Sequence, residues 1–93
     1  MSVANSIEQK LTAALDPAKL EIIDESHRHA GHAGARAGGE SHFHVTIVAS
    51  AFENQSRVAR QRRVYEILAD ELAGPVHALA LTTLTPGEAE MRN

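Results

Sequence analysis

HFHVTIV, residues 42–48, is the stretch that decides the fold, because its side chains alternate in character. Phe43, Val45 and Ile47 fall on one face of an extended chain, and the polar residues between them fall on the other face. This period of two predicts a strand with one buried face. A single strand is not stable alone, so the flanking sequence must supply its partners.

Two further strands are predicted, one on each side of residues 42–48. LEIID at 20–24 comes before them, and we expect it to pair antiparallel with 42–48. VHALALTTL at 76–84 comes after them. Residues 27–39, between the first two strands, hold four Gly and four Ala without an apolar period, which predicts a flexible loop.

Two helical regions complete the pattern. Ile7, Leu11 and Leu15 form an apolar stripe at helical spacing, and Asp16-Pro17 ends it. Ser56 is a good N-cap for a second stretch that stops at residues 74–75, Gly-Pro. Thin apolar spacing between residues 59 and 63 leaves open whether this stretch is one helix or two.

The order helix, strand, strand, helix or helices, strand predicts an α+β fold with a three-stranded sheet whose helices cover one face. We expect a single domain over residues 1–93, with its core at about 6–86 and a flexible tail at 87–93. The chain has 93 residues, 43% of them hydrophobic and 23% charged, which is typical of a folded globular domain. No segment is apolar enough to span a bilayer, and we expect cytoplasmic residence.

Composition also limits the function. The chain has no Cys, so it can form neither a disulfide nor an all-thiolate metal site by itself. Its net charge of −3 disfavours a globally basic nucleic-acid binder, although a local basic patch stays open. No Ser lies in a GxSxG turn, and the neighbouring carboxylates Asp24 and Glu25 point in different directions, so we do not expect an enzyme.

Histidine is unusually frequent, with six residues, five of them between His27 and His44. His29 and His32 lie three apart in the glycine-rich loop, where both rings can turn to one point, but two ligands do not close a metal site. His77 opens the third strand, either as a ligand aimed at that loop or as a partly buried ring with one hydrogen bond. His42 and His44 are expected to be ordinary residues on the outer face of the sheet.

Four arginines fall within seven residues at the start of the second helical stretch: Arg57, Arg60, Arg62 and Arg63. Cations near a helix N-terminus oppose the helix dipole, so helix stability does not account for them. They form either a surface for a partner or nucleic acid, or a solvated helix face.

Taken together, these segments resemble the BolA family, whose members are partners of monothiol glutaredoxins. The match runs from about residue 20 to residue 86, and several separate motifs in the correct order are more specific than any one. The matching residues are ESHRHAGHAG at 25–34, GESHF at 39–43, Phe52, Arg57, RQRRVY at 60–65, LADEL at 68–72 and VHAL at 76–79.

The resemblance implies a class II KH-like fold of order αββααβ. It also implies a heterodimer with a monothiol glutaredoxin around a shared [2Fe-2S] cluster, with glutathione bound through the partner, in iron–sulfur trafficking or iron sensing. In the family the His of the H-A-L motif, here His77, is the fixed cluster ligand. The second ligand comes from the loop; His29 matches the E-S-x-x-H position, and His32 is the alternative.

The resemblance carries a second function, because DNA-binding transcriptional regulation is described for some bacterial members. Here the arginine-rich helix would contact DNA. A KH-like fold normally binds nucleic acid through a GxxG loop between paired helices, and residues 56–72 contain none. Gln61 and His44 depart from the family pattern, which puts a DNA or partner contact in doubt rather than the cluster. We expect weak DNA binding at most.

Overall fold

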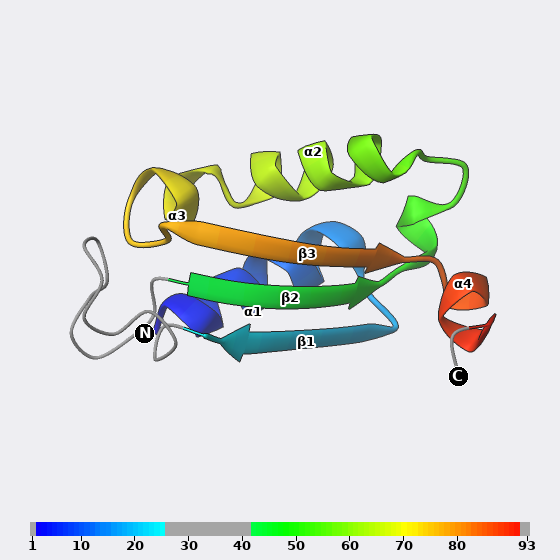
Figure 1. Ribbon diagram of the computed structural model, residues 1–93, viewed down its shortest axis with the longest axis horizontal. Helices are drawn as coiled ribbons and strands as arrows, with labels where there is room; N and C mark the ends of the chain where they lie inside the picture. Colours follow the sequence, from blue (N-terminus) through cyan, green and yellow to red (C-terminus); the bar gives the residue numbers. More distant parts are fainter. Residues whose placement is uncertain (1, 26–41, 92–93) are drawn as a thin grey trace.

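The computed structural model describes residues 2–25 and 42–91. In chain order the elements are α1 (Val3–Leu15), β1 (Lys19–Asp24), β2 (His42–Val48), the short 3₁₀ helix η2 (Ser50–Phe52), α2 (Arg57–Ile67), α3 (Ala69–Ala73), β3 (Ala78–Leu84) and α4 (Pro86–Met91). The predicted order αββααβ is confirmed, with α4 added after β3 (Figure 1).

The three strands form one sheet in the order β1-β2-β3. β1 pairs antiparallel with β2, as predicted, and β2 pairs parallel with β3 (Figure 1). A parallel pair needs a long crossover connection, which α2 and α3 provide here. The parallel register sets His42 opposite Ala78, so β2 and β3 begin at the same end of the sheet.

Helices α1 and α2 cover one face of the sheet, which makes a two-layer fold. Phe43, Val45 and Ile47 are buried on that face, which confirms the alternation in the sequence. The helical layer supplies the other half of the core; its fully buried residues include Ile7 and Leu11 of α1, Val64 of α2, and Leu68 between α2 and α3.

The second helical stretch is two helices. Ser56 Oγ accepts a hydrogen bond from the Ala59 N–H at 3.1 Å, which confirms the predicted N-cap. The stretch divides at Leu68, whose backbone (φ −101°, ψ 22°) leaves helical geometry, and not in the thin apolar region farther upstream.

The expectation of a flexible C-terminal tail is wrong for residues 87–91, which lie in α4. Glu88 Oε1 accepts from the Thr85 N–H at 2.9 Å, and the Glu88 N–H donates to Thr85 Oγ1 at 3.2 Å. This reciprocal pair is a capping box, with Pro86 at the first helical position, where a missing N–H is harmless. Local sequence therefore starts this short helix.

Arg60 holds α4 against the rest of the fold. Its guanidinium donates to both carboxylate oxygens of Glu88, at 2.7 and 3.3 Å. It also donates to the backbone oxygens of Gln55 (3.0 Å) and Thr83 (3.1 Å), and it lies 5.9 Å from the ring centroid of Phe52. One side chain thus joins α2, the end of β3 and α4.

This ion pair predicts that the docking of α4 depends on pH. The hydrogen bond from Arg60 lowers the pKa of Glu88 from 4.5 to about 2. Because the pKa is lower in the folded state, the pair stabilises the fold above pH 4.5, and that contribution is lost as the pH falls toward 2. We expect the backbone amide shifts of residues 86–91 to move toward unfolded values over that range, as measured by NMR.

Glu88→Gln is the matched control, because its amide does not titrate. In this variant the movement of the α4 amide shifts toward unfolded values between pH 4.5 and 2 should be lost. Wild-type shifts that stay constant over the same range would show that the Arg60–Glu88 contact does not hold α4.

Candidate metal centre

His77 lies in the turn that joins α3 to β3, and the backbone before it is fixed. The side chain of Val76 is buried in the core, and its N–H donates to the Glu71 backbone oxygen at 2.9 Å. The side chain of His77 itself is exposed. The turn therefore presents an accessible imidazole from an anchored backbone.

A charged contact ties α3, which precedes this turn, to α1. Lys10 Nζ lies 2.9 Å from Glu71 Oε2 and 3.5 Å from Asp70 Oδ2. The hydrogen bond to Glu71 raises the pKa of Lys10, so its ammonium stays charged. The Glu71 side chain is only 10% exposed, and its backbone oxygen holds the residue before His77.

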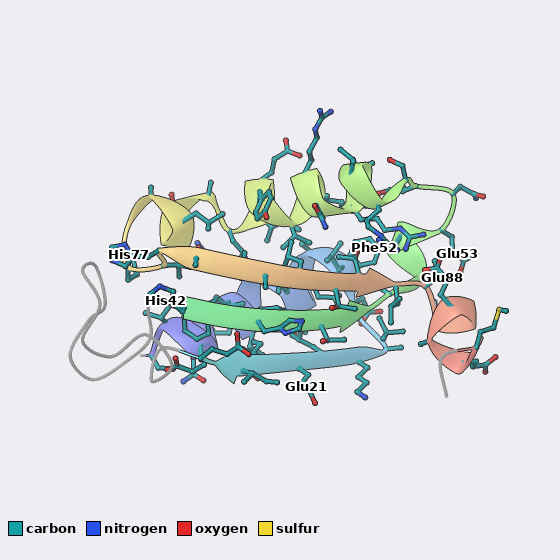
Figure 2. All side chains as sticks on the ribbon, in the orientation of Figure 1. Glu21, His42, Phe52, Glu53, His77 and Glu88 are labelled. Carbon is teal, nitrogen blue, oxygen red and sulfur yellow. The ribbon has the colours of Figure 1, made fainter. Side chains whose placement is uncertain are left out.

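His42, the first residue of β2, lies beside His77. Their ring centroids are 6.2 Å apart, and their planes are inclined by 26° (Figure 2). The interpretation of His42 as an outer-face residue is correct, but sequence reasoning missed this contact. The missing signal was the parallel register of β2 and β3, which the alternation alone does not give.

The predicted loop ligands His29 and His32 lie outside the described residues. The last described residue before them is Glu25, whose N–H donates to the His42 backbone oxygen at 2.7 Å. Chain positions 25 and 42 therefore meet at the corner where β2 and β3 begin. Glu25 and His42 are the described residues that flank the stretch with His29 and His32, and this hydrogen bond joins them.

The donor set at this corner is compatible with a shared metal group. Within residues 2–25 and 42–91, no group of three or more His, Cys, Asp or Glu side chains is arranged to hold a metal ion. The described residues thus offer imidazole nitrogens but no complete cage. Since the sequence has no Cys, any thiolate ligand of a [2Fe-2S] cluster here would come from another molecule.

His44 lies two residues farther along the same strand and is engaged elsewhere. Its Nε2 is 3.1 Å from the hydroxyl oxygen of Thr82 on β3. This places it on the outer face of the sheet, as expected, in a contact separate from the His42–His77 pair.

The four arginines do not form one surface. Arg57 and Arg62 are exposed, and Arg63 is half-buried. Arg60 is only 9% exposed, which corrects its assignment to a partner or nucleic-acid surface, because its guanidinium is used inside the fold. Arg60 contacts the end of β3, whereas His77 precedes its start, so the two lie at opposite ends of that strand (Figure 1).

Among the described residues, no helix is both long enough and apolar enough to cross a bilayer.

Comparison with known proteins gives one consistent match. The model of the family described as BolA-like protein matches residues 11–88. An uncharacterised Sinorhizobium protein from the cobS 5′ region is 49% identical over 95% of this chain and 96% of its own length. The DNA-binding transcriptional regulator BolA of Escherichia coli is 46% identical over 97% of this chain and 82% of its own length.

Solved structures agree. The BolA domain of SufE1 from Arabidopsis thaliana superposes with a TM-score of 0.85 at 43% identity, covering 95% of this chain and 96% of that domain. The chain spans only 23% of the full-length SufE-like protein 1 of the same plant. With the family model covering most of the chain and the fold shared, this protein belongs to the BolA family.

Proposed function

We propose that this chain is an iron–sulfur binding module that forms a heterodimer with a monothiol glutaredoxin around a shared [2Fe-2S] cluster, with glutathione bound through the partner. The observation that carries the proposal is the exposed imidazole of His77, anchored at the corner where residues 25 and 42 meet. A chain with accessible imidazoles and no thiol can fill half of a cluster's ligand set and must share the rest.

In this proposal His77 is the fixed ligand, and His29 or His32 supplies the second nitrogen. Both candidates lie in sequence between Glu25 and His42, which are hydrogen-bonded to each other, and the His42 ring lies beside that of His77. Two imidazoles on one iron and two thiolates on the other resemble Rieske ligation, which raises the reduction potential above that of all-thiolate clusters. When bound, the cluster would supply one-electron chemistry or iron and sulfide for transfer.

The experiment is reconstitution of the chain with a monothiol glutaredoxin, glutathione, iron and sulfide. The proposal predicts a coloured complex with one copy of each protein, whose visible absorption and circular dichroism differ from those of the glutaredoxin alone. The isolated chain should stay colourless. A stable [2Fe-2S] cluster on the chain without glutaredoxin or glutathione would contradict the shared site.

A second candidate function, DNA-binding transcriptional regulation, is favoured by the name of the Escherichia coli relative and by the exposed Arg57 and Arg62. Two features argue against DNA binding by this chain. The net charge is −3, and Arg60 is committed to Glu88 and backbone oxygens. Nucleic-acid binding by this chain would therefore rest on few phosphate contacts.

For DNA we expect weak, non-specific binding at most. Removal of one arginine–phosphate interaction should lower the salt slope by about 0.9, so Arg62→Glu should weaken binding to all sequences alike. Fluorescence anisotropy at several salt concentrations measures this. Sequence-selective binding that survives physiological salt and disappears in Arg62→Glu would make regulation of transcription the better function.

A further inference from the structure

A groove of about 870 Å³ lies between α2, α4 and the second half of β3. Figure 1 shows α2 running along β3 and α4 beyond the end of that strand. Four consecutive residues of β3, 81–84, line the groove, so the backbone edge of the strand borders it. The volume is within the range of roughly 300–1,000 Å³ that ligand sites occupy. The groove can therefore hold part of another molecule beside β3, at the end of the strand away from His77.

The backbone of β3 presents hydrogen-bonding groups on the side of this groove. The Thr83 backbone oxygen accepts from Arg60 Nη1 at 3.1 Å, so this carbonyl points toward α2 and away from β2. Backbone groups of a strand alternate in direction, so the N–H and C=O of Leu81 point the same way. Because β3 is the outer strand in the order β1-β2-β3, no strand of the described residues pairs with this edge. An unpaired strand edge is a template for an added strand.

The charges in the groove leave one cation without a counterpart. Arg60 and Glu88 neutralise each other at 2.7 Å. Arg57, at the start of α2, also lines the groove and is exposed. No carboxylate within residues 2–25 and 42–91 forms an ion pair with it. The groove is therefore complementary to an acidic group at the end where α2 begins.

The rest of the lining combines apolar surface with an unused hydroxyl group. Leu81, Leu84 and Met91 supply the apolar part, and Met91 is 87% exposed. The hydroxyl oxygen of Thr83 is buried and has no hydrogen-bond partner in the described part of the chain. Apolar walls with a few polar groups at fixed positions are typical of a binding groove.

We propose that this groove binds an extended, acidic segment of another protein, which adds as a fourth strand beside β3 and places an Asp or Glu side chain against Arg57. Strand addition obtains affinity from the backbone of the edge and specificity from alternate side chains. An apolar side chain of the segment packs on Leu81 and Met91. Nucleic acid fits less well, because the net charge is −3 and residues 56–72 contain no GxxG loop.

The probe is a library of short, random, linear peptides displayed on phage and selected against the full chain. We expect the selected peptides to be enriched in β-branched residues, as in strands, and to share an Asp or Glu. For a selected peptide made by synthesis, hydrogen exchange measured by NMR should show a slower amide of Leu81 in the complex, because the added strand accepts from that N–H.

Two charge reversals on the same helix separate the groove from a general basic surface. Arg57→Glu should weaken peptide binding by about fivefold or more, as measured by fluorescence anisotropy. Arg57 is exposed and an acidic residue suits the first turn of a helix, so this variant should fold normally. Arg62→Glu is the matched control, because Arg62 is exposed on α2 but does not line the groove. It should bind the peptide as the unmodified chain does.

Equal weakening by Arg57→Glu and Arg62→Glu would overturn the proposal, since the charge of the whole helix would then carry the binding. A library that yields no binding peptide, or peptides that leave the exchange of Leu81 unchanged, would overturn it as well. Single-stranded oligothymidine is the comparison probe, and its displacement of the peptide at physiological salt would assign the groove to nucleic acid instead. None of these results depends on cluster assembly with glutaredoxin.

Discussion

Replacement of His77 by Ala is expected to abolish the mixed-cluster spectrum with glutaredoxin, the largest functional effect of any single substitution in this chain. The His77 side chain is exposed, so its removal should change the free energy of unfolding by less than about 0.5 kcal/mol. The substitution removes the proposed fixed ligand of the cluster. Reconstitution should then give an apo chain beside a glutaredoxin-only cluster, as followed by visible circular dichroism.

Variants at two other positions test whether the loss of the mixed cluster is specific to His77. His29→Ala should reduce the mixed-cluster signal less than His77→Ala, because His32 lies three residues along the same stretch, and the double variant should match His77→Ala. His44→Ala, which removes only the interaction with Thr82, should keep the wild-type spectrum. If His44→Ala abolished the mixed cluster while His77→Ala did not, the ligand assignment would be wrong.

Arg60→Ala should produce the largest decrease in stability. The substitution leaves the backbone oxygens of Gln55 and Thr83 without their donor and removes the packing against the Phe52 ring. We expect the free energy of unfolding to fall by about 3 kcal/mol. For a domain of this size that lowers the melting temperature by roughly 12–24 °C in a thermal scan.

Two variants separate the contributions around Arg60. Glu88→Gln keeps Arg60 and its backbone contacts, so it should destabilise the fold less and mainly loosen α4. Arg57→Ala removes an exposed arginine from the same helix and should leave the melting temperature nearly unchanged. Equal effects of Arg57→Ala and Arg60→Ala would show that Arg60 has no internal role.

The fold could be predicted wherever a local pattern reports burial. Alternation in residues 42–48 indicated the buried face of β2, and Ser56 marked the start of α2. The six-residue α4 was missed because it is too short for an apolar period, although Thr85 and Glu88 carry the spacing of a capping box. What holds it in place is Arg60, 28 residues earlier, and no local pattern contains that pairing.

The candidate site was predicted less completely than the fold, because its contacts join residues that are distant in sequence and leave no local pattern. His77 was proposed as a ligand from its place after Gly-Pro and from the family motif, and the structure shows that its side chain is exposed. Its neighbour His42 was assigned to an uninvolved outer face, because the contact depends on the parallel register of strands separated by two helices. Arg60 was grouped with exposed arginines, since charged residues are seldom buried unless paired, and its partners are distant in sequence.

In the proposed complex this chain supplies histidine nitrogen to a cluster shared with glutaredoxin. The most direct measurement is pulsed electron paramagnetic resonance of the reduced complex, with ¹⁵N-histidine in this chain alone and an unlabelled glutaredoxin. We predict strong ¹⁵N couplings from directly bound imidazole, with the coupling from His77 absent in His77→Ala. A reduced [2Fe-2S] signal from the complex without any ¹⁵N coupling would contradict the shared ligation.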